Sequence, residues 1–101
     1  MKRILNNFNK TFENRVRLSV MSILVVNDWV EFNRFKEILS PISDGNLASH
    51  LKNLEDKKYI QVRKEFVGRK PQTTYAVTEE GKQAFEEHLN ALEKILKGGI
   101  S

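Results

Sequence analysis

Apolar residues recur at helical spacing in several stretches of the chain, and one stretch with alternating spacing interrupts them. The first long run covers residues 11–26, where apolar side chains at four-residue steps predict one face of a helix. Thr11 is the expected N-cap of this helix, and Asn27-Asp28 is expected to end it. A separate helical turn is expected before it, on the apolar residues Ile4, Leu5 and Phe8.

A second, shorter helix follows. Trp29-Val30-Glu31 is long enough only for a short strand. The apolar spacing of residues 32–39 then predicts a helix, which Ser40-Pro41 ends because proline disfavours the helical conformation in the residue before it. Ser43 and Asp44 are both possible N-caps of the helix that comes next.

This third helix, about residues 43–57, is predicted to have one apolar and one polar face. Leu47, Leu51 and Leu54 lie within about 60° of one another at 100° per residue. His50 falls at the margin, nearer the leucines. The opposite face carries small or hydrogen-bonding side chains: Gly45, Asn46, Ser49, Lys52, Asn53 and Asp56. In an isolated helix such a face is usually only solvated, so its meaning depends on the elements that follow.

A β-hairpin and a last helix complete the pattern. Residues 60–66 alternate between apolar and polar side chains, with one interruption, and predict a strand. A turn is expected over residues 67–72 and a returning strand over 73–77. Thr78 is the expected N-cap of the last helix, and Gly98-Gly99 is expected to end it. Its apolar stripe consists of Phe85, Leu89, Leu92, Ile95 and Leu96.

This order of elements predicts a winged helix-turn-helix. The fold class is α+β, mainly helical, in the order α-α-α-β-β-α, with a possible short extra strand after the first helix. The chain is 101 residues long, so residues 1–101 are expected to form a single domain. Residues 41–45 are the turn, the third helix is the reading helix, and the wing covers about residues 63–74.

Composition excludes several classes of function. The chain has no cysteine and two histidines, which excludes disulfides, a thiolate nucleophile and a three-histidine metal site. The longest apolar run, residues 23–26, is far shorter than the ~20 residues that span a bilayer, and the N-terminus lacks a signal-peptide core. No nucleophile beside a base and no glycine-rich phosphate loop indicates an enzyme. We therefore expect a cytoplasmic protein with no cofactor, metal or membrane partner.

Positive charge is concentrated in two segments. The formal net charge of the chain is +4, but residues 57–77 alone hold six basic side chains and one acidic one. Residues 1–20 hold five basic side chains and one acidic one, whereas residues 21–56 and 78–101 are net negative. A local excess of positive charge can attract a polyanion even when the total is modest.

A reading helix beside a basic hairpin fits double-stranded DNA. The major groove admits one α-helix and is read by hydrogen bonds from polar side chains, while cations on an adjacent element hold phosphates. The expected DNA-binding residues are Ser43, Asn46, Ser49, His50, Lys52, Asn53, Arg63, Lys64, Arg69, Lys70 and Gln72. For Arg15 and Arg17 two alternatives stay open, which are contact with DNA beside the site and pairing with acidic residues of the last helix.

The alternative function is a winged-helix module for protein–protein interaction without sequence-specific DNA binding. Such a module predicts an apolar or acidic outer face on the reading helix and a neutral wing. This sequence has neither, although Asp44 and Asp56 reduce the positive field at the two ends of the reading helix.

Several segments resemble a known family. Residues 49–60 look like the segment from reading helix to strand in MarR- and ArsR-type regulators. Residues 43–51, 68–75 and 78–81 resemble the small stand-alone winged-helix transcriptional regulators related to them, and Arg15–Leu18 resembles their opening helix. The resemblance covers about residues 11–97. It implies a dimer that binds operator DNA, with the third helix in the major groove and the wing along the backbone or minor groove. The cysteine clusters that let some ArsR-type proteins sense metals are missing, so that function is not carried over.

The two ends of the chain predict a homodimer. They carry more apolar surface than a three-helix core can cover, and exposed patches of that extent usually mark an interface. Packing of the two ends on each other within one chain is the alternative. A two-fold dimer would place two reading helices about 34 Å apart, one DNA turn. No particular small-molecule effector is indicated. The expected interface residues are Leu5, Phe8, Phe12, Phe85, Leu89, Leu92, Ile95 and Leu96.

Overall fold

The computed structural model describes residues 2–98, with side chains from residue 5 onward. The elements are α1 (Lys2–Asn7), the 3₁₀ helix η1 (Lys10–Glu13), α2 (Arg15–Leu24), β1 (Val30–Glu31), α3 (Phe32–Ile38), α4 (Asp44–Asp56), β2 (Ile60–Val67), β3 (Lys70–Val77) and α5 (Glu79–Leu96). This is the predicted winged helix, mainly helical α+β, and β1 is the short extra strand. No helix within residues 2–98 is long and apolar enough to cross a membrane.

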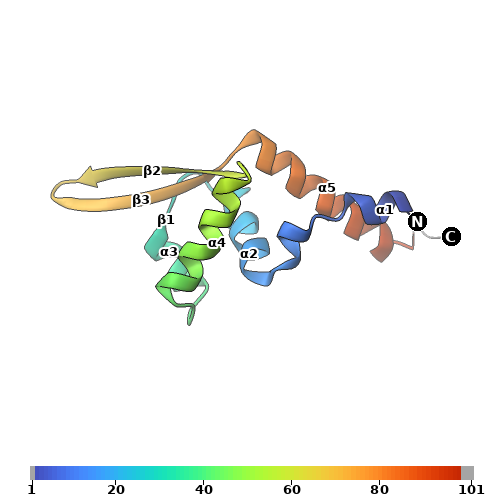
Figure 1. The fold of residues 1–101 in the computed structure, drawn as a ribbon, viewed down its shortest axis with the longest axis horizontal. Helices are drawn as coiled ribbons and strands as arrows, with labels where there is room; N and C mark the ends of the chain where they lie inside the picture. Colours follow the sequence, from blue (N-terminus) through green and yellow to red (C-terminus); the bar gives the residue numbers. More distant parts are fainter. Residues whose placement is uncertain (1, 99–101) are drawn as a thin grey trace.

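The three strands form one antiparallel sheet in the order β1-β3-β2. The pairing of β2 with β3 runs from Ile60 opposite Val77 to Val67 opposite Lys70, while β1 pairs only with Thr74 and Tyr75. The hairpin of β2 and β3 therefore continues well beyond β1. Figure 1 shows it projecting from the helical body on one side, with α5 and α1 side by side at the other end. The molecule is elongated, 58 × 28 × 21 Å.

The predicted helix over residues 11–26 is wrong at its start, because two asparagines divide the segment. The side chain of Asn9 accepts a hydrogen bond from the backbone N–H of Thr11 (3.0 Å) and caps η1. The side chain of Asn14 accepts from two backbone N–H groups in the first turn of α2 (2.9 and 3.1 Å). Asparagine offers the backbone these local alternatives to a continuous helix. Thr11 is therefore not the N-cap, and α2 begins at Arg15.

The predicted turn over residues 67–72 is too long, because the strands continue through most of it. Only Gly68 and Arg69 form the turn, and Gly68 has a φ of +67°, a conformation that glycine adopts without strain. Pro71 lies inside β3, opposite Phe66. Proline lacks the N–H that a central strand needs, and it is tolerated here because β1 does not extend along this part of β3.

The core lies where the helices meet the base of the hairpin. It consists of Phe12, Val20, Met21, Leu24, Val30, Phe35, Leu47, Leu51, Leu54, Ile60 and Phe85. Phe12 and Phe85, which we expected at a dimer interface, belong to this core because their side chains pack on each other between η1 and α5. Their rings form an edge-on contact with centroids 5.2 Å apart. The expectation of a surface role is wrong for these two residues.

The N-terminal segment is attached to the rest of the chain through Asn9. Its backbone N–H donates to Nδ1 of His88 on α5 (3.0 Å), and its side-chain amide donates to the hydroxyl of Tyr59 (3.0 Å). The His88 ring is buried and also contacts the edges of Phe8 and Phe12. His88 is thus a packed, hydrogen-bonded residue, and Phe8 is half-buried against it.

The first turn of α5 packs directly on the backbone that follows α4. Thr78 is the N-cap, as predicted, and its hydroxyl accepts from the N–H of Gly81 (2.9 Å) and donates to the carbonyl of Lys58 (2.7 Å). The N–H of Thr78 donates to the carbonyl of Tyr59 (3.0 Å). A Cβ added at Gly81 would overlap that carbonyl oxygen and lie 2.7 Å from its carbon. Glycine is therefore required for this close approach.

We expect Gly81→Ala to lower the free energy of unfolding by about 2 kcal/mol or more, because backbone has to move to admit the methyl group. Urea denaturation followed by circular dichroism measures this. Gly45→Ala is the matched control, since a Cβ there meets no atom within 4 Å and alanine favours the helix by about 0.5 kcal/mol. Equal stability of the two variants would contradict the close approach of α5 to Tyr59.

Candidate nucleic-acid interface

The outer face of α4 is a row of exposed polar side chains. Ser43 is the N-cap, because its hydroxyl oxygen accepts from the backbone N–H of Asn46 (3.1 Å). Leu47, Leu51 and Leu54 are buried beneath the helix, as their spacing predicts. The predicted polar residues of the opposite face are exposed to solvent: Asn46, Ser49, Lys52 and Asn53.

Two lysines on and beside α4, Lys52 and Lys36, have acidic partners. Lys52 Nζ lies 3.1 Å from Asp56 Oδ1 and 3.8 Å from Glu55 Oε1. The hydrogen bond that Lys52 donates to Asp56, with the charges of Asp56 and Glu55, raises the pKa of Lys52. Lys36 of α3 forms an ion pair with Asp44 at the start of α4. Asp44, Glu55 and Asp56 outnumber Lys36 and Lys52 by one charge, so the α4 face has no positive excess, and the positive charge comes from the elements around it.

The structure separates the roles of Arg15 and Arg17, which the sequence left open. The guanidinium of Arg17 donates to the carbonyl of Thr11 (2.7 Å), and its Nη1 lies 3.0 Å from Nδ1 of His50. Arg15 is exposed and forms no ion pair within the described part of the chain. With Asn46 it lines a hollow of about 470 Å³ between α2 and the turn that precedes α4. Neither arginine pairs with an acidic residue of α5 in residues 2–98.

His50 is held to α2 rather than projecting freely from α4. A guanidinium only donates hydrogen bonds, so Nδ1 of His50 must accept from Arg17 and the neutral ring carries its proton on Nε2. Partial burial and the positive charge of Arg17 lower the pKa of His50 below its usual 6.5. The ring is therefore held neutral, and its remaining donor is the N–H at Nε2.

We expect an NMR titration to give His50 a pKa below 6.5. Because the folded-state pKa is depressed, the unfolded chain binds more protons, and the free energy of unfolding falls as the pH drops through 6.5. Arg17→Gln should raise the pKa of His50 only part of the way to 6.5, since burial is the larger cause of the shift. His50→Gln identifies the resonance. A wild-type pKa at or above 6.5 contradicts the Arg17–His50 contact.

The two faces of the hairpin carry different chemistry. Side chains alternate along a strand, and residues opposite each other share a face. Lys64 and Phe66 of β2 therefore share a face with Pro71 and Tyr75 of β3. The Tyr75 ring packs 6.1 Å from Phe35 of α3, which makes this the helix side of the sheet.

Arg63 lies on the opposite face, so the structure separates it from Lys64. Its guanidinium carbon sits 4.1 Å from the centroid of the Trp29 ring, and its Nε lies 3.4 Å from Glu65 Oε1. The side-chain amide of Gln72 donates to the carboxylate of Glu31. Arg63 and Gln72 were both expected to contact DNA and are instead engaged within the chain. In the described residues, the wing cations without an acidic partner are Lys64, Arg69 and Lys70.

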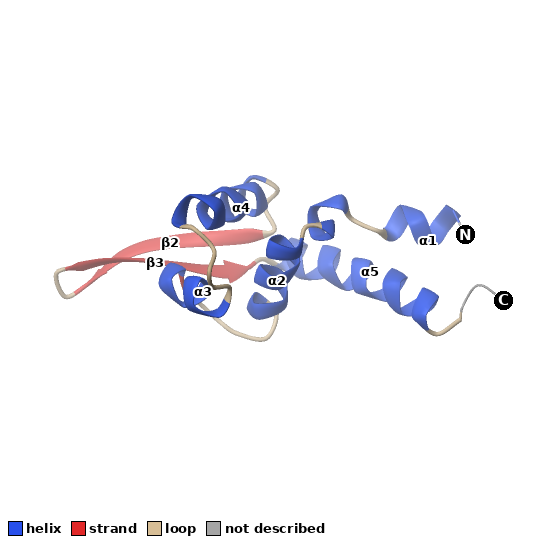
Figure 2. Cartoon of the chain, turned by 90° about the horizontal axis from the view of Figure 1, so that it is seen from below, coloured by secondary structure: helices blue, strands red, loops and turns tan. Residues whose placement is uncertain are grey.

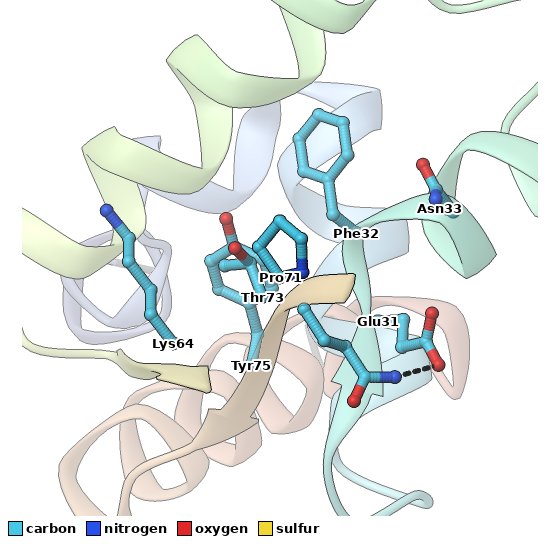
Figure 3. A pocket seen from close by; sticks show the side chains of 8 residues that line it. Glu31, Phe32, Asn33, Lys64, Pro71, Thr73 and Tyr75 are labelled. Carbon is cyan, nitrogen blue, oxygen red and sulfur yellow. Dashed lines mark hydrogen bonds between the residues drawn. The ribbon is translucent and has the colours of Figure 1, made fainter. Parts of the chain in front are cut away.

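A hollow of about 390 Å³ lies at the base of the wing, between α3 and β3. Figure 3 shows Lys64 and Thr73 extending from the hairpin on the same side of the sheet as Phe32. Glu31 and Gln72, joined by their hydrogen bond, also line it. No group of three metal-ligating side chains occurs among the residues described. The hollow continues the Lys64 face of the wing toward the helices.

These elements define a winged helix with an exposed reading helix and a basic wing. The family model for the winged helix DNA-binding domain matches residues 16–96, and the chain belongs to this family. An uncharacterized protein of Methanocaldococcus jannaschii is 31% identical over 88 residues, which is 87% of this chain and 95% of that protein.

Solved structures share this fold. A transcriptional regulator homologue from Pyrococcus horikoshii superposes with a TM-score of 0.84 at 27% identity, covering 96% of this chain and 93% of that one. Bacillus subtilis PadR in complex with operator DNA has a TM-score of 0.66 at 18% identity, covering 75% of this chain and 47% of that one. A MarR-family regulator from Enterococcus faecalis has a TM-score of 0.70 at 21% identity, covering 89% of this chain and 76% of that one. The predicted relation to small winged-helix transcriptional regulators is confirmed.

Proposed function

We propose that this protein is a homodimeric transcriptional regulator that binds double-stranded DNA with sequence specificity. The observation that carries the proposal is that the polar outer face of α4 and the wing cations without acidic partners are both exposed. The PadR neighbour was solved with operator DNA, which supports the same use of the fold here. The proposal assigns no catalytic step to the chain.

The charge distribution suggests which DNA contacts α4 makes and which the wing makes. Because the α4 face has no positive excess, it is suited to hydrogen bonds with base edges, and the carboxamides of Asn46 and Asn53 can pair with adenine in the major groove. The phosphate contacts fall to Lys64, Arg69 and Lys70 of the wing. Arg15 adds a further cation beside the start of α4.

The remaining predicted residues take secondary roles. The hydroxyl of Ser43 accepts the capping hydrogen bond and still has its own hydrogen to donate to a phosphate oxygen. Ser49 lies near the middle of the exposed face. Lys52 is exposed, so a phosphate can replace Asp56 as its partner without removing either group from water.

The homodimer is proposed from the end of the molecule opposite the wing (Figure 2). Phe85 is buried under the body, but the same stripe of α5 becomes exposed at Leu89, Leu92 and Leu96 as the helix extends away. Leu96 is 77% exposed. A second copy covering this stripe would remove the apolar surface from water. Ile95 of α5 and Leu5 of α1 lie in the same region and are also exposed.

Selection of bound duplexes from a random pool tests the proposed function. Duplexes of about 30 base pairs hold two half-sites one helical turn apart. The selection is run at about 50 mM and about 200 mM salt, because phosphate contacts weaken steeply over that range. We expect a near-palindromic sequence to be enriched. Recovery of no shared sequence would overturn sequence specificity, and no binding at low salt would favour a protein-interaction module instead.

Two arginines of the same hairpin make a matched pair for the wing. Arg69→Ala should weaken binding to selected and random duplexes alike and reduce the slope of log affinity against log salt by about one. Arg63→Ala removes the same charge from the face that packs on Trp29, and it should leave the slope unchanged. Both are measured by fluorescence anisotropy. An unchanged slope for Arg69→Ala, or equal losses for both, counts against the wing assignment.

We expect Leu92→Glu to convert the dimer to a monomer in sedimentation equilibrium, because a carboxylate cannot be buried in an apolar seam without a partner. The monomer should bind the selected duplex at least about tenfold more weakly, since two linked half-site contacts become one. Val26→Glu, at an exposed valine in the loop after α2, should remain dimeric. A monomeric wild-type protein contradicts the proposed dimer.

A further inference from the structure

We propose that Phe66 at the tip of the wing is an apolar wedge that enters the minor groove of the bound duplex and partly unstacks a base step. This inference rests on the proposed DNA binding. It assigns to one apolar side chain the separation of stacked bases, which the wing cations cannot perform.

The exposure of Phe66 has no explanation within the chain. Its side chain is 74% exposed, whereas the other phenylalanines with described side chains are buried or half-buried. Figure 1 shows the hairpin tip well beyond α3 and α4, where no helix lies beside it. The residue opposite Phe66 is Pro71, so the tip presents a phenylalanine ring beside a proline ring on one face.

The surroundings of Phe66 favour a polyanion as its partner. Lys64 lies two residues away on the same face, and Arg69 is in the turn, whereas Lys70, opposite Val67, lies on the other face of the tip. None of these cations has an acidic partner in the described part of the chain. The one carboxylate of the wing, Glu65, points to the opposite face and pairs with Arg63. An exposed apolar ring flanked by Lys64 and by the turn residue Arg69 matches the proteins that insert apolar side chains into the minor groove while holding its phosphates.

The reach of the hairpin fits the groove next to the one that α4 would occupy. Phe66 is six residues beyond the buried Ile60, about 20 Å along a strand. The minor groove lies about 17 Å from the centre of the adjacent major groove, half of a 34 Å turn. With α4 in the major groove, the wing tip therefore meets the neighbouring minor groove.

The test compares Phe66→Ala with Val67→Ala on duplexes of fixed sequence. Val67 is the adjacent apolar residue, 59% exposed on the other face of the hairpin. The probe is an alternating thymine–adenine duplex with 2-aminopurine in place of one adenine, because such steps unstack easily and the analogue brightens when unstacked. We expect Phe66→Ala to lose about tenfold in affinity and to abolish the fluorescence rise. Val67→Ala should behave as the wild type, and Phe66→Leu should keep part of the effect.

Two further measurements separate a wedge from other contacts. Phe66→Ala should leave the salt slope unchanged, because no phosphate contact is lost, whereas Arg69→Ala lowers it. An inosine–cytosine duplex has the minor groove of an adenine–thymine duplex and the major groove of guanine–cytosine. Phe66→Ala should lose affinity for the inosine duplex as it does for the adenine–thymine one.

The outcomes distinguish this inference from the proposed function. If the wild-type protein binds these duplexes but Phe66→Ala binds equally well, the wedge is overturned while DNA binding stands. If Phe66→Ala loses no affinity for the inosine duplex, the wedge is also overturned. If Phe66→Ala changes the association state in sedimentation instead of the affinity for DNA, the tip contacts a second copy of the chain. If the wild type binds no duplex, the proposed function itself fails.

Discussion

The arrangement of the whole molecule depends on the close contact between the first turn of α5 and the backbone at Tyr59. At this point α4 has just ended, β2 is about to begin and β3 has just returned. The absence of a side chain at Gly81 lets the helix approach the carbonyl of Tyr59, and Thr78 joins both sides by hydrogen bonds. From this contact the hairpin and α5 extend toward opposite ends of the molecule. The reading helix, the wing and the exposed stripe of α5 are therefore placed by one junction.

Sequence patterns were most informative where burial alone decides the structure. The leucines of α4 could be predicted to face inward and the polar residues outward, because one apolar stripe leaves only one way to place the helix. The hairpin was predictable for the same reason. The break at Asn14 was not, since a capping asparagine and a mid-helix asparagine look alike until the backbone is seen. Pro71 was misinterpreted as part of a turn because the short extent of β1 is a tertiary feature.

The candidate site was predicted as a set of residues but not as an arrangement. Counting charges identified the wing, yet it treated Arg63 and Lys64 as equivalent although alternation places them on opposite faces. Helical spacing placed Phe12 and Phe85 at the surface, because their contact joins distant parts of the chain and spacing does not reveal it. The exposure of Phe66 was hidden in a strand pattern, where an outward phenylalanine and an inward one have the same sequence signature.

The two-residue turn at Gly68 and Arg69 has a consequence for how this hairpin can vary. Pairing is continuous from the turn back to Ile60, so nothing in between absorbs an inserted or deleted residue. A change of one residue in a strand would move Phe66 to the Trp29 side and bring Glu65 to the helix side. Insertions or deletions that preserve the two faces must therefore change a strand by two residues, because side chains alternate with a period of two.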